Sequence, residues 1–411
     1  MAAYVERYVD SLLDDVFPEL AAVMLTGPRA CGKTTTAARR ASSILRLDDE
    51  QRARAFAAAP DALLAAQDLP TLIDEWQEVP ESLAAIKRAV DSGSGGGRFL
   101  ITGSVRARRT GAVWPGTGRV IPFRMHSLAR GEIEASPNAA NFLQRLFGDE
   151  DPSPATLRSA PTIVDYITYA IQGGFPEAFR LTERARDAWY PGYVDQLVHR
   201  DVAALADVRS PDRLSALLHA VALSTAGVPQ NRTLTEAAGI DGRTVNVYLD
   251  LLDDLRIIER VPAWSSNRLK RLVRTPKLYV ADTGLATSLI RADKSTILSS
   301  GDLLGRAIDT FVAAQILPLV ALSHPRVDAF HLRDSDGRHE IDLLLEGRGG
   351  TVVGIEIKAA NAVKPQAARH LEWLRDSLGS SFKRGVVFHT GDTTYPMGDR
   401  IWAMPIASIW H

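Results

Sequence analysis

One segment near the N-terminus limits the folds open to this chain more than any other. It follows an apolar run at residues 21–26 and precedes a helical pattern at residues 35–41. Its form is Gly-x-x-x-x-Gly-Lys-Thr, with the defined positions at Gly27, Gly32, Lys33 and Thr34. Glycines at these places let backbone amides turn inward around a phosphate at a helix N-terminus. Since a strand precedes the loop and a helix follows it, the segment predicts a parallel α/β sheet with a phosphate-binding loop.

The chemistry of this loop predicts ATP and Mg²⁺ as cofactors. Lys33 is expected to bridge the β- and γ-phosphates, and the Thr34 hydroxyl is expected to bind Mg²⁺. The expected nucleotide-binding residues are Gly27, Pro28, Arg29, Ala30, Cys31, Gly32, Lys33, Thr34 and Thr35.

Two further strands carry polar residues that fit the same site. The strand at residues 71–74 ends in Asp74 and Glu75, of which the first is expected to hold Mg²⁺ and the second to polarise the attacking water. By themselves they could equally be a solvated acidic pair, but their combination with the loop favours catalysis. The strand at residues 99–102 leads to Thr102 and Ser104, and Ser104 is either a group that places the water or a turn residue. The predicted catalytic set is Lys33, Asp74, Glu75 and Ser104.

Several arginines follow these strands. One of them is a candidate arginine finger, acting within the chain or on a neighbouring subunit of a homo-oligomer. The sequence does not choose among Arg106, Arg108, Arg109, Arg119 and Arg124.

The length and charge of the chain limit its organisation and partners. A chain of 411 residues with 45% hydrophobic content is too long for one compact core, so several domains are expected. The net charge of −1 provides no general attraction to nucleic acid or membrane. A single cysteine, Cys31, excludes an internal disulfide framework and fits a reducing cytoplasm. The apolar stretch 311–322 predicts a buried helix, and we expect a cytoplasmic protein without a membrane partner.

The alternation of strand and helix patterns predicts an α/β fold with four parts. These are an AAA-like P-loop domain at residues 1–155, a helical lid or connector at 156–206, a winged helix at 207–285, and a second α/β domain at 286–411.

Residues 234–261 have the layout of a winged helix. A short helix at 234–238 and a turn at Gly239 precede a second helix at 243–255 with an apolar side. In DNA-binding versions the start of the second helix enters the major groove. A basic run follows, with Arg268, Lys270, Arg271, Arg274 and Lys277 as candidate phosphate contacts. DNA is therefore a candidate partner, although such a module can also serve for packing alone.

The last suggestive pattern is a set of carboxylates near the C-terminus. Asp342 and Glu356 lie on two expected strands, and Lys358 shares a face with Glu356 because residues two apart in a strand project together. If the strands pair as a hairpin, Asp342 lies on the same face. Such groups can hold a divalent cation for phosphodiester cleavage, with Asp309 as an added acid. The alternative is a row of solvated polar residues.

Taken in order, the motifs resemble a widespread prokaryotic family of predicted AAA-type ATPases with a C-terminal domain of unknown function. They are GPRACGKTT, LIDEWQEVP, RFLITGS, SLARGE, GGFPEA, HRD, YVADTGL and EIDLLLE followed by GIEIK. The resemblance spans nearly the whole chain. It implies an AAA-like core, a winged helix and an end domain with a restriction-endonuclease-like core.

The resemblance also assigns residues. It implies phosphate binding by Gly27, Gly32, Lys33 and Thr34, and an acidic motif at Asp74 and Glu75. It places the end-domain site at Asp342, Glu356 and Lys358, with a possible second metal ion. Where such proteins usually have a glutamate near Leu304, this chain has Asp309, which is one methylene shorter.

Three functions follow as hypotheses. The first is an ATPase whose nucleotide state reorients the winged helix and the nuclease-like domain on DNA. The second is an ATP-dependent DNA nuclease. The third is a nucleotide-gated switch that binds a protein partner and has an inactive nuclease-like domain.

Overall fold

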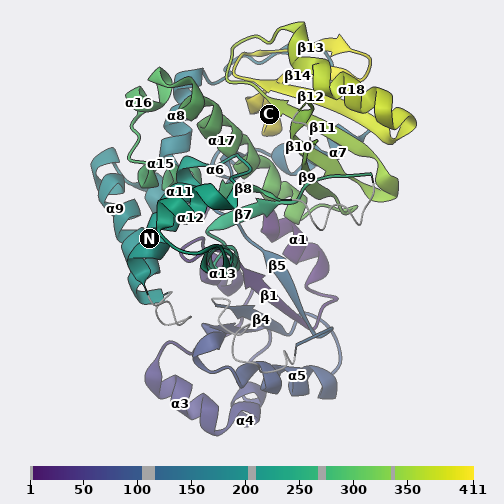
Figure 1. Cartoon of the computed structure of the whole chain (residues 1–411). Coiled ribbons are helices and arrows are strands. Elements are labelled where there is room, and N and C mark those ends of the chain that lie inside the picture. The colour runs from purple at the N-terminus through teal and green to yellow at the C-terminus, as the bar shows by residue number, and fades with distance from the viewer. Residues whose placement is uncertain (1–2, 104–115, 202–209, 267–274, 335–337) are drawn as a thin grey trace.

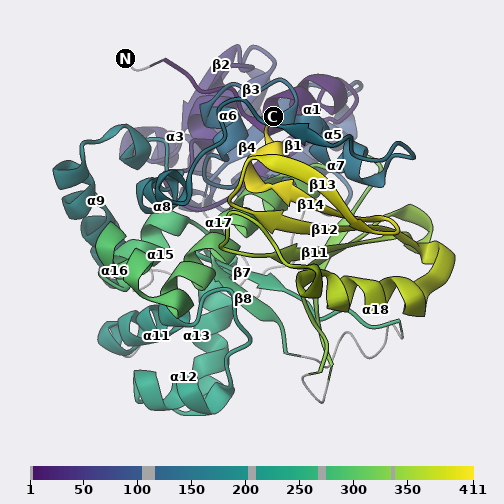
Figure 2. The ribbon, with the colours of Figure 1, turned by 90° about the horizontal axis from the view of Figure 1, so that it is seen from above.

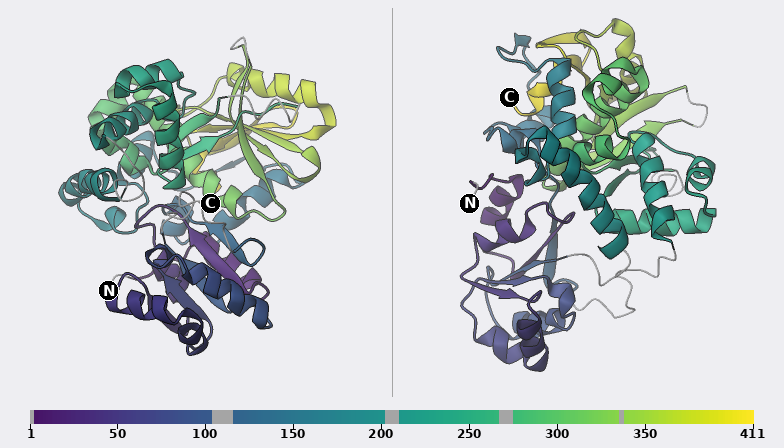
Figure 3. Two further views of the ribbon diagram at one scale, coloured as in Figure 1. Left: turned by 60° about the horizontal axis from the view of Figure 1, so that its bottom comes forward. Right: turned by 90° about the vertical axis from the view of Figure 1, so that its left-hand side faces the viewer.

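The computed structural model describes residues 3–103, 116–201, 210–266, 275–334 and 338–411. Figure 1 shows the N-terminal parallel-sheet domain in purple and blue at the bottom and the C-terminal sheet in yellow and green at the upper right. Helices from the middle of the chain lie beside the C-terminal sheet. In both views of Figure 3 the N-terminal domain occupies one end of the molecule and these two later parts occupy the other.

The N-terminal domain is built on a five-stranded parallel sheet with the order β2-β3-β4-β1-β5. Its strands are β1 (Ala22–Thr26), β2 (Ser43–Arg46), β3 (Thr71–Asp74), β4 (Phe99–Thr102) and β5 (Val120–Arg124). Its helices are α1 (Tyr8–Val16), α2 (Lys33–Ala38), α3 (Glu50–Ala58), α4 (Pro60–Ala65) and α5 (Ser82–Ser92).

Both faces of this sheet are buried, as parallel sheets require. Met24 packs on one face against Leu83 and Ile86 of α5. On the opposite face Leu25 packs against Leu13 of α1 and Ala37 of α2. The predicted parallel α/β sheet is confirmed, and β4 lies between β1 and β3, the strands that lead to the phosphate-binding loop and to Asp74.

A mainly helical part follows the parallel sheet. Its helices are α6 (Arg130–Ile133), α7 (Phe142–Phe147), α8 (Ile163–Gln172), α9 (Glu183–Gln196), α11 (Pro211–Leu223), α12 (Asn231–Ala238), α13 (Gly242–Asp254), α15 (Thr283–Leu289) and α16 (Lys294–Ser299), with a π-helical turn at Leu197–Asp201. A two-stranded antiparallel sheet pairs β7 (Ile258–Val261) with β8 (Lys277–Val280). Helices α12 and α13 match the two helices predicted at residues 234–238 and 243–255. The designation of this part as a winged helix stays a prediction.

The C-terminal sheet has seven strands in the order β6-β13-β14-β12-β11-β10-β9. They are β6 (Ala155–Thr156), β9 (Asp328–Arg333), β10 (Glu340–Glu346), β11 (Val352–Ile357), β12 (Phe382–His389), β13 (Thr393–Gly398) and β14 (Ile401–Pro405). Helix α18 (Arg369–Leu378) packs on one face, through Leu371 and Leu374. Helix α17 (Gly301–Ala321) packs on the other; seen from above, it lies between the sheet and helices α15 and α16 (Figure 2).

Short 3₁₀ turns complete the elements of the described chain. They are η1 (Trp76–Glu78), η3 (Ala139–Asn141), η4 (Ala178–Arg180), η6 (Arg348–Gly350), η7 (Pro365–Ala368), η8 (Gly379–Ser381) and η9 (Ile406–Ile409).

Helix α17 contains the apolar stretch that predicted a buried helix. Among the described residues it is the one helix long and apolar enough, by length and composition, to cross a membrane, and half of that apolar window is buried. Ile308, Phe311, Val312 and Ile316 of this helix pack in the largest hydrophobic core. In this fold α17 is therefore a core helix.

The core under the C-terminal sheet extends back to residues 139–170. Phe142, Leu146 and Tyr166 pack in the same cluster as Phe388 and Trp410, and Tyr166 meets Trp410 edge to face at 6.4 Å between ring centroids. Packing thus joins segments that the sequence placed in the P-loop domain and connector to the C-terminal domain.

Candidate nucleotide site and C-terminal carboxylate cluster

The phosphate-binding loop connects β1 to α2 and depends on two glycines. Gly32 immediately precedes α2 and has φ +98°, in the left-handed region that favours glycine. A Cβ on Gly27 would lie 2.4 Å from the carbonyl oxygen of Met125. Gly32 therefore has a backbone conformation that favours glycine, and the close approach of Met125 leaves no room for a side chain at Gly27.

Lys33 is the first residue of α2 and its side chain is almost buried, with 9% exposure. Its ammonium donates to the carbonyl oxygens of Gly27 at 3.0 Å and Pro28 at 2.8 Å. These hydrogen bonds hold the ammonium group of Lys33 against the loop, where the sequence predicts phosphate binding.

Asp74 is the meeting point of three elements. Its Oδ1 accepts a hydrogen bond from the Thr34 hydroxyl at 2.8 Å and another from the Thr102 hydroxyl at 2.6 Å. Because β3, β4 and β1 are adjacent and parallel, their carboxyl ends lie at one edge of the sheet. A hydroxyl and a carboxylate are oxygen ligands that Mg²⁺ prefers, so the donor set fits a magnesium ion bound together with a nucleotide.

Glu75 directly follows Asp74 in an uncommon conformation. Its φ of +56° and ψ of +46° lie in the left-handed region, which costs a non-glycine residue about 1–2 kcal/mol. Its carboxylate accepts a hydrogen bond from the Gln77 amide. Strain of this kind is concentrated at functional sites, which supports the predicted catalytic position of Glu75.

The remaining predicted residues of this site divide into two groups. Ser104, Arg106, Arg108 and Arg109 lie outside the residues that the structure describes. Arg119 pairs with Asp91 on the surface, with its Nε 2.7 Å from the carboxylate.

Arg124, at the end of β5, forms an ion pair with a residue of the β7–β8 sheet. Its guanidinium pairs with Glu259 of β7, and His126 Nε2 lies 3.4 Å from the same carboxylate. Burial opposes ionisation of Glu259, but Arg124 and His126 outweigh it and lower the pKa of Glu259 to about 2. Glu259 thus joins β7 to the strand next to the phosphate-binding loop.

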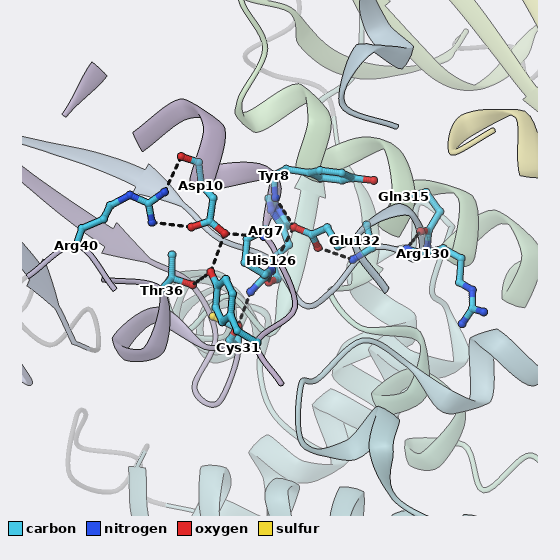
Figure 4. Close-up of polar contacts among 12 residues, drawn as sticks. Arg7, Tyr8, Asp10, Cys31, Thr36, Arg40, His126, Arg130, Glu132 and Gln315 are labelled. Carbon is cyan, nitrogen blue, oxygen red and sulfur yellow. Dashed lines mark hydrogen bonds and ion pairs between the residues drawn. The ribbon is translucent and has the colours of Figure 1, made fainter. Parts of the chain in front are cut away.

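Arg7 forms a buried contact with the loop that the sequence did not reveal. Its guanidinium donates to the carbonyl oxygens of Cys31 and His126, each at 2.7 Å, and its Nε donates to Glu132 at 3.1 Å. Glu132 also accepts from the backbone amide of Tyr8. Figure 4 shows Arg7 between the loop at Cys31 and Glu132. Arg7 therefore ties the segment before α1 to the loop.

The motif SLARGE contains Glu132 and could have indicated that this residue has a role. No sequence pattern, however, indicated that Arg7 is its partner. Arg130, two residues before Glu132 in the same motif, continues the connection, since its backbone amide donates to Gln315 of α17 at 2.6 Å. The network in Figure 4 thus runs from the loop to the core helix of the C-terminal domain.

The C-terminal carboxylates are brought together as the sequence predicted. Strands β10 and β11 form an antiparallel pair, and Asp342 Oδ2 accepts from the backbone amide of Ile357 at 2.9 Å. Lys358 donates to Glu356 Oε2 at 2.6 Å. Asp309 approaches from α17, and we call Asp309, Asp342 and Glu356 the carboxylate cluster.

Lys277 corrects one expectation. It was placed in an exposed basic run, but it is 3% exposed, because β8 directs its side chain into the carboxylate cluster. Its ammonium lies 2.7 Å from Asp309 Oδ2 and 3.3 Å from Asp342 Oδ1. Lys277 is therefore no surface contact for DNA in this fold; Arg268, Lys270, Arg271 and Arg274 lie outside the described residues.

Burial and neighbouring charge set the protonation of the cluster. Burial, with the charge of Asp342, raises the pKa of Asp309 and of Glu356. Burial also opposes ionisation of Asp342, but Lys277 and Lys358 outweigh it and lower its pKa. Burial opposes the charge of Lys277, yet its acidic neighbours raise its pKa well above the usual value. Asp342 and Lys277 are therefore charged, and Asp309, whose pKa is raised to about 6, is also charged at neutral pH.

The cluster borders an open pocket of about 480 Å³, whose lining includes Asp309, Asp342, Arg306, Arg333 and Lys358. Across the residues that the structure describes, no group of three or more histidine, cysteine, aspartate or glutamate side chains is placed to hold a metal ion. The metal role of Asp342 and Glu356 therefore stays a prediction.

Comparisons with known proteins agree with the class of fold. Residues 20–134 match a family described as an AAA domain, and residues 163–296 and 304–409 match two domains of unknown function, DUF8612 and DUF4143. These matches support an AAA-type ATPase with a C-terminal domain of unknown function.

Two similar proteins come from mycobacteria. The uncharacterized protein Rv2008c of Mycobacterium tuberculosis and the uncharacterized protein Mb2031c of Mycobacterium bovis are each 28% identical over 401 residues. The alignment covers 94% of this chain and 80% of each relative. The similarity thus extends through all parts of the chain.

Proposed function

We propose that the protein is a Mg²⁺-dependent ATPase of AAA type whose nucleotide state controls the helical and C-terminal domains in an action on DNA. The observation that carries the ATPase assignment is the convergence of Thr34 and Thr102 on Asp74, beside Lys33. A phosphate-binding loop, a hydroxyl and an acid at one sheet edge are the parts that nucleotide hydrolysis requires.

Each residue has a defined task in this proposal. The loop amides and Lys33 bind the phosphates, while Thr34 and Asp74 would hold Mg²⁺, which neutralises charge on the phosphates. Glu75 accepts a proton from water that attacks the γ-phosphate. Arg7 keeps the loop in shape through its bond to the Cys31 carbonyl.

Two substitutions test the ATPase. Lys33→Ala is expected to lower ATP turnover at least 100-fold, and Glu75→Gln is expected to keep ATP binding while turnover falls by a similar factor, each estimated at ~3 kcal/mol or more of lost transition-state stabilisation. Lys294→Ala, on exposed α16, is the matched control and should match the unsubstituted protein. Unchanged hydrolysis in Lys33→Ala refutes the assignment.

The action on DNA rests on α11–α13 with the β7–β8 sheet, and on the carboxylate cluster. ATP turnover measured with and without double- and single-stranded DNA tests it, and we expect stimulation by one of them. Equal turnover under all conditions favours the alternative of a nucleotide-gated switch that binds a protein. A homo-oligomer and a cytoplasmic location complete the proposal and can be tested by light scattering and cell fractionation.

An ATP-dependent nuclease is the second candidate, because Asp342 and Glu356 lie on adjacent strands and Lys358, which directly follows the second strand, binds Glu356. Incubation with DNA, ATP and Mn²⁺ or Mg²⁺ tests for cleavage. Equal cleavage by Asp342→Ala would assign the activity to a different site or to a contaminant.

A further inference from the structure

Lys277 enters the carboxylate cluster from an element that carries none of its three carboxylates. Asp342 and Glu356 belong to neighbouring strands, and Asp309 belongs to α17, whereas Lys277 begins β8 of the separate two-stranded sheet. The pairing of Val261 with Lys277 fixes its backbone to β7. The position of this ammonium is therefore set by the small sheet.

The ammonium engages the oxygens that a metal ion would need. Lys277 donates to Asp309 Oδ2 at 2.7 Å and lies 3.3 Å from Asp342 Oδ1, while Tyr279 donates to Asp309 Oδ1 at 3.0 Å. The other oxygen of Asp342 accepts from Ile357. Every carboxylate oxygen of these two aspartates has a partner from the chain itself.

Glu356 shows that the polar network is incomplete. Its side chain is 6% exposed, and Lys358 binds its Oε2. Its Oε1 is buried without a hydrogen-bond partner. A buried oxygen of this kind is costly, and it is the type of group that a bound cation satisfies. The pocket beside Asp309, Asp342 and Lys358 gives solvent ions access to the cluster.

We propose that Lys277 is an internal cation that occupies the carboxylate cluster and excludes a divalent metal ion, so that the cluster binds metal only when the β7–β8 sheet withdraws Lys277. The inference rests on the proposed role of the cluster in metal-dependent chemistry on DNA. An ammonium 2.7 Å from Asp309 repels a second cation at the same oxygens, because a low-dielectric interior strengthens the repulsion between like charges.

The test measures binding of Mn²⁺ alone, without nucleotide, to the full chain by electron paramagnetic resonance. The unsubstituted protein and Asp342→Asn are expected to bind Mn²⁺ equally, since Lys277 already blocks the site. Lys277→Met is expected to gain one site at least 10-fold tighter, and the double variant Lys277→Met with Asp342→Asn is expected to lose it. Weak binding near Asp74 is common to all four proteins and cancels in these comparisons.

Two results overturn the proposal. One is a site in the unsubstituted protein that Asp342→Asn removes, which decides the question even where Lys277→Met fails to fold. The other is folded Lys277→Met that gains no site. Mn²⁺ should also raise the Tm of Lys277→Met and leave the Tm of the unsubstituted protein unchanged. ATP turnover, measured separately, shows whether the proposed ATPase stands, because Mn²⁺ binding at this cluster does not require it.

Discussion

Thr102, on the strand next to β3, can set the orientation of Asp74, the acid that we propose binds Mg²⁺. Its hydroxyl is fully buried and donates to Asp74 Oδ1 at 2.6 Å. A hydrogen bond to a charged group contributes about 1.5–3 kcal/mol. The bond therefore holds Asp74 toward Thr34, where the two together would bind Mg²⁺.

Thr102→Val removes this donor and keeps the shape of the side chain. We expect ATP turnover to fall by about 10-fold, corresponding to ~1.4 kcal/mol, and the Mg²⁺ concentration needed for half-maximal turnover to rise. Thr102→Ser, which keeps the hydroxyl, should restore most of the rate. Equal rates in all three proteins would show that Asp74 needs no orienting bond from β4.

Lys277 makes a second residue-scale prediction, this time on stability. Lys277→Met leaves Asp309 and Asp342 buried beside each other without their cation, and loss of one partner of a buried ion pair costs about 3–5 kcal/mol. Urea denaturation should show this loss. Lys277→Met combined with Asp309→Asn should be more stable than Lys277→Met alone, since the second change removes one of the unpaired charges. A loss below 1 kcal/mol in Lys277→Met would contradict the buried pairing.

These residues differ in how far the sequence could predict them. Thr34 and Asp74 stand at fixed places in patterns that recur because phosphate and magnesium impose the same geometry. Lys277 and Arg7 carry no such pattern, and each gains its role from a partner far along the chain. The basic residues near Lys277 in the sequence indicated a surface that contacts phosphate. In the structure, all four residues of β8, including Lys277, are buried.

At the scale of elements, β7 and β8 connect the two candidate sites. Glu259 of β7 pairs with Arg124 beside the phosphate-binding loop, and its partner across the small sheet is Tyr279, whose hydroxyl binds Asp309. A shift of this sheet relative to β5 would therefore move Lys277 relative to the carboxylate cluster. The small sheet thus makes contacts both with the strand beside the phosphate-binding loop and with the carboxylate cluster.

Glu259 predicts a pH dependence of stability. Its pKa is about 2 in the folded protein, against an ordinary value of 4.5. A carboxyl group with a lowered folded pKa contributes stability that is present above pH 4.5 and is lost as the pH falls toward 2. The contribution is on the order of 3 kcal/mol at neutral pH.

Glu259→Gln should accordingly be less stable than the unsubstituted protein at pH 7, and the difference should shrink between pH 4.5 and 3. Urea denaturation at a series of pH values measures both curves. Asp250→Asn is a suitable control, since Asp250 pairs with Arg260 on an exposed face. A difference between the two curves that is constant with pH would exclude ionised Glu259 as the source.

Strands with a clear apolar or alternating sequence pattern were predicted, and strands with a weak pattern were missed. The strands expected at residues 21–26, 71–74 and 99–102 are found as β1, β3 and β4, each within one residue of its expected position. The two strands expected around Asp342 and Glu356 are found as β10 and β11. Strands β13 and β14 were not predicted. The first contains Pro396, which is unfavourable inside a sheet, and the second is only five residues long.

For the molecule as a whole, the C-terminal sheet depends on chain that the sequence assigned elsewhere. Arg384 of β12 is 2% exposed. Its guanidinium donates to the carbonyl oxygens of Arg145 at 2.8 Å, Leu146 at 2.9 Å and Glu150 at 2.7 Å. A buried charge without such partners is strongly unfavourable. The predicted boundary at residue 155 separates these carbonyl groups from Arg384, because a sequence pattern does not reveal which surface a segment covers.

A fragment of residues 286–411 is therefore expected not to fold by itself, although it contains six of the seven strands of the C-terminal sheet. It lacks Phe142, Leu146 and Tyr166, which fill the core against Phe388, and removal of one such aromatic side chain costs about 3–5 kcal/mol. It also lacks the carbonyl groups that satisfy Arg384. Circular dichroism of this fragment should show no cooperative thermal transition, whereas a fragment of residues 135–411, which restores these contacts, should melt cooperatively. The prediction is wrong if the shorter fragment melts as sharply as the longer one and within a few degrees of it. That result would show that residues 139–170 pack on the C-terminal domain without being needed for its folding, because a core that depends on them could not form in the shorter fragment.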